Sequence, residues 1–183
     1  MEKFIEVYDD IIHPKLANQI EDLLLNNSPQ DTKYTYIRNI TGSGDKANKY
    51  LPGFEYEFIN SISNFYEPTQ YFLSQILYKL SNHLNFQINQ ILKGRSFLQI
   101  PSITSQKNSI HIDFDTPHWV CLYYVTDSDG DTILFDDNHN EIKRVTPKKG
   151  RIIFFDGSIK HCSSSPSKTH RSIINFDFIG EKL

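Results

Sequence analysis

The spacing of hydrophobic residues along the chain changes at about residue 94. Before that point, apolar residues recur at helical intervals in two segments, which predicts a helix from Pro14 to about Leu25 and a second helix over 72–84. Short strands are expected at 4–8 and 33–39, and the segment 41–45 is interpreted as an exposed loop and a candidate lid. We therefore expect residues 1–94 to form a mostly helical flank.

From residue 95 onwards, short runs of β-branched and aromatic residues are separated by Gly, Pro, Asp, Asn and Ser, which is typical of strands joined by turns. The expected strands are Ser96–Ile100, Ser109–Asp113, Trp119–Val125, Thr132–Phe135, Ile142–Val145, Arg151–Phe155, Lys160–Ser163 and Arg171–Phe178. They predict a mainly β fold with N-terminal helices (α+β), a jelly roll with helices packed on one face. We expect residues 1–183 to form one domain, with 95–183 as the core that carries the site.

Composition and charge narrow the class of protein. A chain of 183 residues with 38% hydrophobic and 22% charged content is ordinary for a globular domain, and a net charge of -3 gives no field that would attract nucleic acid or an anionic membrane. No apolar run approaches the roughly 18 residues that a membrane-spanning helix needs, and two cysteines cannot form a disulfide framework. Since no apolar signal region follows Met1, we expect a soluble, cytoplasmic protein. Its oligomeric state does not follow from the sequence.

Histidine and carboxylate side chains after residue 94 have the spacing of metal ligands. His111 and Asp113 are two positions apart in an expected strand, so both side chains should point to the same face. His161 would complete a set of two histidines and one carboxylate, which leaves open positions on a metal and suits ferrous iron. A closed zinc site would require four protein ligands, usually with thiolates, and neither Cys121 nor Cys162 belongs to a Cys-x-x-Cys pair.

The spacing alone is weak evidence, because seven histidines and 22 acidic residues in a chain of 183 give about one such pair by chance. A second pair, His139 and Glu141, lies in a turn-rich stretch and is interpreted as a solvated turn. Arg171 supports the first pair, because it follows His161 by ten residues and a guanidinium binds a carboxylate through two parallel hydrogen bonds. From the residues alone, two structural core histidines with a surface Asp113 remain the alternative to a metal site.

At these residues the sequence resembles the iron(II)- and 2-oxoglutarate-dependent oxygenase superfamily, in particular its prolyl 4-hydroxylase-like branch with small phage and bacterial members. The resemblance covers about 95–179, and it is carried by the order and spacing of His111–Asp113, Trp119–Val125, Ser128–Phe135, Pro147–Phe155, His161 and Arg171. The chain departs from the family pattern at Ile173, where many relatives carry Ser, and at Gly130-Asp131, where Gly-Gly is usual.

The resemblance implies a double-stranded β-helix with iron(II) as the cofactor and with 2-oxoglutarate and dioxygen as co-substrates. The two histidines and the aspartate would be the catalytic iron ligands, and Arg171 would bind the distal carboxylate of 2-oxoglutarate. Tyr124 would donate a hydrogen bond to the same co-substrate, and Asn175 and Gln99 would line its pocket.

The function implied by the resemblance is a dioxygenase that hydroxylates a C–H bond of a peptide, a protein or a small molecule, with a peptidyl proline as the first candidate. Asp113 argues against halogenation, because the halide of the halogenating branch takes the position of that carboxylate. Two rival functions stay open: a non-catalytic, cupin-like metal-binding module used for binding or sensing, and a zinc hydrolase built on the same triad. Arg171 and Tyr124 argue against the first rival, since a pure metal binder needs no dicarboxylate anchor.

Overall fold

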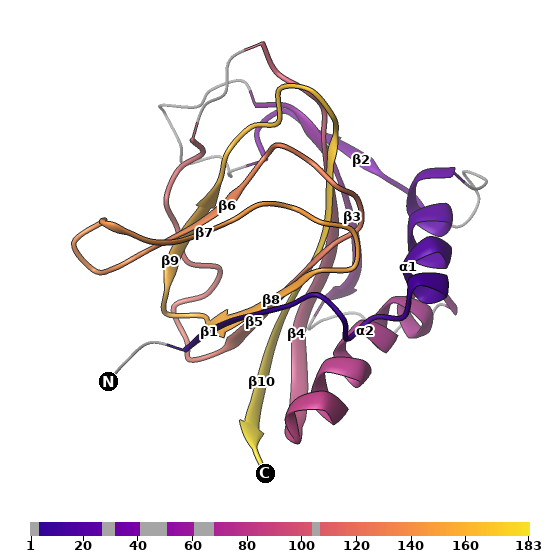
Figure 1. Ribbon diagram of the computed structural model, residues 1–183, viewed down its shortest axis with the longest axis vertical. Helices are drawn as coiled ribbons and strands as arrows, with labels where there is room; N and C mark the ends of the chain where they lie inside the picture. The colour runs from indigo at the N-terminus through magenta and orange to yellow at the C-terminus, as the bar shows by residue number, and fades with distance from the viewer. Residues whose placement is uncertain (1–3, 27–31, 41–50, 61–67, 104–106) are drawn as a thin grey trace.

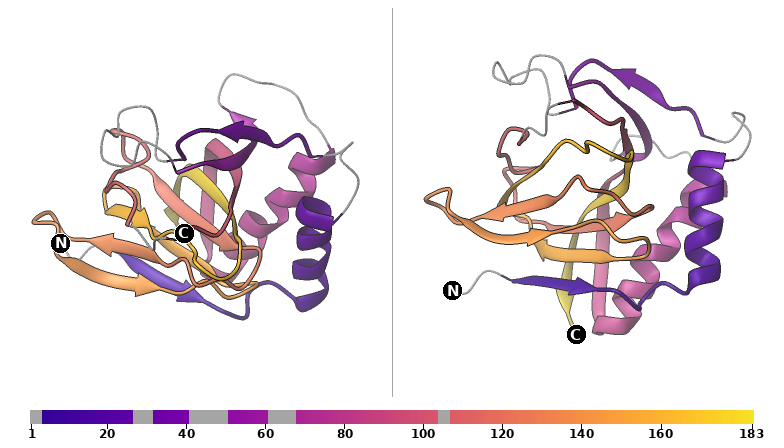
Figure 2. Two further views of the ribbon diagram at one scale, coloured as in Figure 1. Left: turned by 90° about the horizontal axis from the view of Figure 1, so that it is seen from above. Right: turned by 45° about the horizontal axis from the view of Figure 1, so that its top comes forward.

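Two antiparallel β-sheets lie face to face, and two helices cover the outer side of the larger sheet (Figure 1, Figure 2). The computed structural model describes residues 4–26, 32–40, 51–60, 68–103 and 107–183. The strand order of the larger sheet is β1 (Ile5–Tyr8), β8 (Ile152–Asp156), β5 (Trp119–Tyr124), β10 (Arg171–Lys182), β4 (Phe86–Gln99), β3 (Gly53–Asn60) and β2 (Thr35–Ile37). The order of the smaller sheet is β7 (Glu141–Val145), β6 (Thr132–Phe135) and β9 (Lys160–Ser163). This architecture confirms the predicted mainly β jelly roll with helices on one face.

The two helices form where the apolar spacing predicts them. α1 (Pro14–Glu21) has proline in its first turn and continues into a π-helical turn, Asp22–Asn26. α2 (Pro68–Leu84) buries the apolar face that its i, i+4 pattern defines. It ends at Asn85, whose φ of 51° lies in the left-handed region that asparagine tolerates better than most residues. The chain therefore passes directly from α2 into β4.

β10 contributes to the core on both sides of the larger sheet. Because side chains alternate along a strand, Ile174 and Phe176 pack with the helices in one hydrophobic core. The alternate positions of the strand, Arg171, Ile173 and Asn175, face the other way and line the space between the two sheets. One strand thus supplies apolar residues to the helix-facing core and a partly polar row to the interior of the jelly roll.

Residues 1–94 contain more sheet than the sequence-based interpretation allows. β3 lies entirely in this part of the chain, and β4 begins directly after α2 and pairs along its whole length with β10. Phe54 to Phe58 alternates aromatic and acidic residues, which is a strand signal that the helical interpretation overlooked. The prediction of a mostly helical flank is wrong in this respect, because partners that are distant in sequence stabilise these strands. The candidate lid at 41–45 lies outside the described residues.

The expected strand Ser109–Asp113 does not form, whereas the other expected strands form at or close to their predicted positions. Within this segment, His111 alone pairs, through an isolated bridge in which the two N···O distances to His161 are 3.0 and 2.9 Å. Asp113 lies in a bend beyond the bridge. The prediction is wrong because backbone pairing with the β9 region is interrupted, with bridges at Lys107 and His111 and none beyond His111 in this segment.

Candidate active site

His111, Asp113 and His161 converge in the space between the two sheets. Each offers one ligand atom, and the three atoms lie within 4.8 Å of one another. Nε2 of His161 is 3.4 Å from Oδ2 of Asp113, and the centroids of the two imidazole rings are 4.7 Å apart. The backbone bridge between the two histidines sets this approach. The structure thus brings the three predicted ligands into one compact group.

Backbone carbonyls orient both imidazole rings. Nδ1 of His111 lies 2.9 Å from the carbonyl oxygen of Ser109, and Nδ1 of His161 lies 3.1 Å from that of Ile159. Because a carbonyl oxygen only accepts hydrogen bonds, each Nδ1 carries the hydrogen in this geometry. The lone pair of each ring is then on Nε2, which is the arrangement in which protein histidines commonly bind metals.

The charges around the triad favour an ionised Asp113 and a neutral His111. Burial alone would raise the pKa of Asp113, but His161 and Arg95 outweigh burial and hold the pKa well below its usual range. Partial loss of hydration and then the charge of His161 lower the pKa of His111. Burial acts downward on the pKa of His161 as well, but the contact with Asp113 outweighs it and the pKa is raised. The ionised carboxylate and the neutral His111 ring are the forms that a metal requires.

A second set of polar side chains, on β4 and β10, lies beside Asp113 and is linked to its carboxylate. Arg95 on β4 donates from Nη2 to Oδ1 of Asp113 at 3.0 Å, and the same Nη2 lies 3.8 Å from Oδ2 of Asp177 on β10. Asn175 donates to the two oxygens of Asp177 at 3.3 and 3.2 Å. Sequence reasoning missed Arg95 and Asp177. The available signal was their even spacing from other site residues on the same strands, which places them on the same face.

A further group of potential ligands shares Asp113. Its carboxylate, that of Asp177 and the ring of His118 offer atoms within 4.8 Å of one another. Nε2 of His118 is buried and has no hydrogen-bond partner, and the ring packs against Gly157, where an added Cβ would lie 2.3 Å from Nε2. However, Arg95 already places a positive charge beside both carboxylates. A cation bound here would meet that charge, which makes the group with two histidines the better metal site.

Arg171 is the first residue of β10, whereas Asn175 and Asp177, which lie close to the triad, are in the middle of that strand. The side chain is 3% exposed, and its guanidinium donates to the carbonyl oxygen of Gly130 at 2.9 Å, to Oε1 of Gln99 at 3.1 Å and to Oγ1 of Thr132 at 2.9 Å. All three partners are neutral, and within the described ranges Arg171 forms no ion pair. Burial lowers the pKa of Arg171. A buried cation with neutral partners is costly, so an anion bound beside it would stabilise the site.

The two departures from the family pattern leave the contacts of Arg171 intact. A Cβ at Gly130 would lie 3.0 Å from Cδ of Arg171 and 2.9 Å from a backbone oxygen, so the retained glycine is the one that this packing requires. Asp131, in place of the usual second glycine, pairs with Arg144 at 3.1 Å near the surface. Ile173, in place of the usual Ser, lines the cavity and adds an apolar wall.

Of the three further residues predicted to contact the co-substrate, Gln99 and Asn175 line the cavity and Tyr124 does not. The hydroxyl of Tyr124 lies 2.7 Å from Oγ1 of Thr132 and 3.2 Å from the carbonyl oxygen of Val145. Burial raises the pKa of Tyr124 to about 12, so the hydroxyl stays protonated. Its direct contact with the co-substrate stays a prediction, and in the structure its hydroxyl donates to Thr132, whose Oγ1 also accepts from the guanidinium of Arg171.

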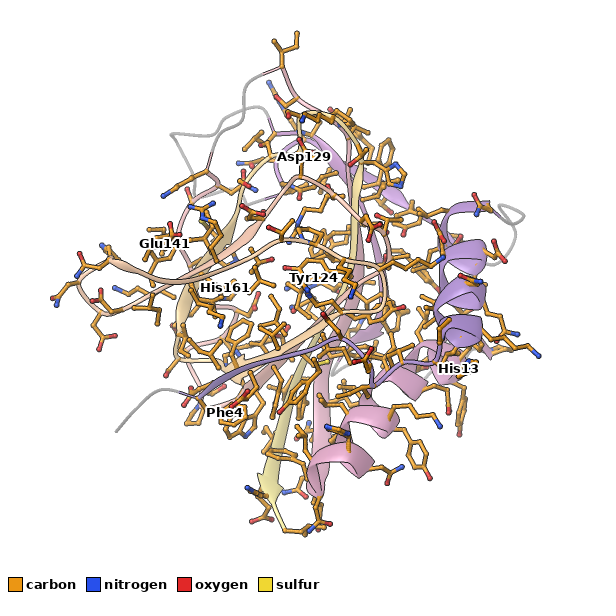
Figure 3. All side chains as sticks on the ribbon, in the orientation of Figure 1. Phe4, His13, Tyr124, Asp129, Glu141 and His161 are labelled. Atoms are coloured by element: carbon orange, nitrogen blue, oxygen red, sulfur yellow. The ribbon has the colours of Figure 1, made fainter. Side chains whose placement is uncertain are left out.

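A cavity of about 500 Å³ joins the triad to Arg171. Figure 3 shows His161 and Tyr124 in the interior of the fold, with Glu141 at the periphery. His139, in the second pair with the spacing of ligands, lies in the exposed connection between β6 and β7, and Glu141 is the exposed first residue of β7, where it pairs with Arg144 at 2.6 Å. The interpretation of that pair as solvated agrees with this exposure, although Glu141 belongs to a strand.

Several solved structures are similar to this chain. An oxidoreductase of the 2OG-Fe(II) oxygenase family from Burkholderia pseudomallei matches with a TM-score of 0.69 and 8% identity, over 95% of this chain and 84% of that chain. A viral collagen prolyl hydroxylase from Paramecium bursaria Chlorella virus-1, in a complex with 2OG, matches with a TM-score of 0.60 and 14% identity, over 100% and 97%. A prolyl hydroxylase from Trichoplax adhaerens, in complex with a peptide fragment of hypoxia inducible factor, matches with a TM-score of 0.64 and 14% identity, over 96% and 83%.

The chain therefore has the fold of the 2-oxoglutarate- and iron(II)-dependent oxygenases. More particularly, this is the fold of prolyl hydroxylases such as the viral and Trichoplax proteins. No family model and no curated protein sequence matches the chain. None of the helices in the described part of the chain is long and apolar enough to cross a membrane.

Proposed function

We propose that the protein is an iron(II)- and 2-oxoglutarate-dependent dioxygenase that hydroxylates a C–H bond of its substrate. One observation carries the proposal: a single cavity joins a triad of two histidines and one carboxylate to the buried guanidinium of Arg171. The triad is suited to a metal and the guanidinium to an anion. The fold is shared with solved oxygenases of this class, which supports the same function.

The triad fits a ferrous ion. Oδ2 of Asp113 is buried and has no hydrogen-bond partner, so it is available as a ligand. Together with the Nε2 lone pairs of His111 and His161, it forms the donor set of two imidazoles and one carboxylate that leaves three positions open on non-haem iron. When bound, the iron would supply the activation of dioxygen, which amino-acid side chains cannot perform.

Arg171 would bind the distal carboxylate of 2-oxoglutarate. Its guanidinium offers donors in a planar fork that matches a carboxylate, and its three neutral partners hold the fork in place. Because Oε1 of Gln99 accepts from Arg171, the amide nitrogen of Gln99 remains available to donate into the same cavity. A dicarboxylic acid would thus find a cationic group at one end of the cavity and a metal at the other.

A peptidyl proline is the first candidate for the substrate. The Trichoplax hydroxylase, one of the similar structures, is in complex with a peptide fragment. In this chain, the apolar side chains Ile112 and Phe114 flank Asp113 and line the cavity together with Ile37 and Ile40 of the β2 region. These walls suit an uncharged ring, such as that of proline, beside the metal.

Succinate formation tests the proposed function. The protein is incubated in air with Fe²⁺, 2-oxoglutarate and a panel of proline-containing peptides, and succinate and hydroxylated peptide are measured. We expect succinate from the unaltered protein, with a loss of at least about 100-fold in a His161→Ala variant. The matched control is His139→Ala, which removes an exposed histidine and should leave the rate unchanged.

Other outcomes would support the rivals. Metal binding with no affinity for 2-oxoglutarate and no succinate above the level of the His161→Ala variant would favour a non-catalytic metal-binding module. Retention of zinc, together with a hydrolytic activity that does not depend on dioxygen, would favour a hydrolase.

A further inference from the structure

We propose that Arg95 is a positioning residue for the metal site, which holds one oxygen of Asp113 so that only the other oxygen binds the metal. The carboxylates of Asp177 and Glu55 lie 3.8 and 3.7 Å from the Arg95 guanidinium. The inference deepens the proposed function and rests on it, because it concerns the carboxylate ligand of the same triad.

The two oxygens of Asp113 have different environments. Oδ1 accepts a hydrogen bond from Nη2 of Arg95 at 3.0 Å. Oδ2 has no hydrogen bond, is buried, and lies 3.4 Å from Nε2 of His161. An unrestrained carboxylate presents either oxygen or both to a cation. The guanidinium therefore selects Oδ2 as the single ligand atom.

A single ligand oxygen matters because of the number of positions that the chemistry needs. Two histidines and one oxygen of Asp113 would supply three ligand atoms to a ferrous ion and would leave positions open for 2-oxoglutarate and dioxygen. If both oxygens of the carboxylate bound, one of these open positions would be lost. By keeping Oδ1 occupied, Arg95 would preserve the open position that the co-substrates require.

The position of Arg95 is itself well determined. Its charge lies 5.0 Å from the ring centroid of Phe97, and its side chain is 17% exposed. Nη2 lies 3.8 Å from Oδ2 of Asp177, which is fully buried, and Nη1 lies 3.7 Å from Oε1 of Glu55 on β3. Both oxygens of Asp177 accept from the amide of Asn175. Two further carboxylates and an aromatic ring thus lie around the guanidinium that donates to Asp113.

Two roles of Arg95 predict opposite changes in metal affinity. If Arg95 acted only through its charge, its removal would strengthen metal binding, because a positive group beside a ligand repels a cation. If it positions the ligand, its removal weakens metal binding, since outer partners of metal ligands commonly affect affinity by about 10- to 100-fold. The sign of the change therefore separates positioning from a purely electrostatic effect.

The test is the dissociation constant for Mn²⁺, measured by calorimetry on the full chain in the absence of any reaction. We expect Arg95→Met to bind Mn²⁺ about 10- to 100-fold more weakly, and Arg95→Lys, which keeps one donor, to recover part of the loss. The matched control is Arg144→Met, which removes a guanidinium near the surface and should leave the constant unchanged. Circular dichroism verifies that each variant is folded. If Arg95→Met does not fold, Arg95→Lys decides, because a point-like ammonium on a different side-chain stem cannot reproduce the position of the guanidinium donor and should still weaken binding measurably.

Unchanged or tighter binding in the folded Arg95 variants would overturn the positioning role while leaving the proposed function standing. Absence of Mn²⁺ binding by the unaltered protein, or binding that survives in His161→Ala, would instead overturn the proposed metal site and this inference with it.

Discussion

At the scale of single residues, Arg171 is the side chain that bears most directly on the proposed function, because its guanidinium is buried. Its three hydrogen bonds go to neutral oxygens, and its place at the cavity wall leaves a positive charge facing the cavity. An anion bound beside it would offset the cost of burying that charge. In the proposed function Arg171 would bind the co-substrate, and it is therefore the first target for substitution.

Arg171→Lys should weaken 2-oxoglutarate binding by about 10- to 100-fold, because an ammonium cannot supply the planar fork that a carboxylate matches. The measurement is the dissociation constant of 2-oxoglutarate for the Mn²⁺-loaded protein. Affinity for Mn²⁺ alone should stay the same, and Arg144→Lys provides the control at an exposed arginine. An unaltered affinity for 2-oxoglutarate in Arg171→Lys would contradict the assigned role.

Tyr124→Phe separates a direct from an indirect role of the tyrosine. The substitution removes the hydroxyl that contacts Thr132 and Val145, and it should lower the free energy of unfolding by about 1–2 kcal/mol, as measured in urea. Since the hydroxyl does not line the cavity, 2-oxoglutarate affinity should fall by only a few-fold. A loss as large as that in Arg171→Lys would mean that Tyr124 contacts the co-substrate directly.

At the scale of the elements, ion pairs fasten the N-terminal segment to the turn before β8. Asp9, just after β1, accepts from Arg151 at 2.6 and 3.0 Å and from Lys148 at 3.3 Å. Lys149 of the same turn donates to Asn18 and Glu21 of α1. These contacts tie the N-terminal segment and α1 to the turn that leads into β8, and α1 lies on the same side of the molecule as α2 (Figure 1).

The pair of Asp9 and Arg151 gives stability a defined pH dependence. The hydrogen bond from Arg151 lowers the pKa of Asp9 to about 2 in the folded protein, against about 3.9 in an unfolded chain. Its stabilising contribution is therefore fully present above about pH 4 and is lost as the pH falls towards 2. Asp9→Asn should cost about 1 kcal/mol at pH 6, because both side chains are partly exposed.

Urea unfolding of the two proteins at pH 6 and pH 3 measures this contribution. We expect the difference in free energy of unfolding between the unaltered protein and Asp9→Asn to shrink at pH 3. A difference that is constant over this range would show that the ion pair contributes nothing that titrates with Asp9.

At the scale of the whole molecule, the candidate metal site joins two regions that are distant in sequence. The segment 107–111 and the segment 161–164 meet through two backbone bridges, and the smaller sheet packs on the larger one through a shared core. A cation that bound ligands on both segments would be bound by the folded state alone. Metal binding should therefore stabilise the entire jelly roll.

Mn²⁺ at 100 times its dissociation constant should add about 2.7 kcal/mol to the free energy of unfolding, which corresponds to a rise of roughly 5–10 °C in Tm for a domain of this size. Differential scanning calorimetry measures the shift as a function of Mn²⁺ concentration. His161→Ala should abolish it, and His139→Ala should retain it. A shift that persists in His161→Ala would place the bound metal elsewhere.

Much of the fold was predictable from local patterns, because alternation and helical spacing are properties of short segments. α2 and most strands after residue 94 appear where those patterns place them. β3 and the beginning of β4 were missed, although residues 54–58 alternate, since these strands exist through pairing with partners far along the chain. The expected strand at 109–113 does not form, although its sequence suits a strand. Within this segment, His111 alone has a backbone pairing partner among the described residues.

The sequence by itself determined which residue types are available for chemistry: His111, Asp113, His161 and Arg171 in an order and spacing that resemble an oxygenase. Only the tertiary structure decided that Arg95 donates to Asp113 and lies beside Asp177, and that Tyr124 donates to Thr132. The physical reason is register. Which residues of β4 and β10 lie opposite each other depends on the packing of the whole sheet, and a shift of one position would turn every one of these side chains to the other face.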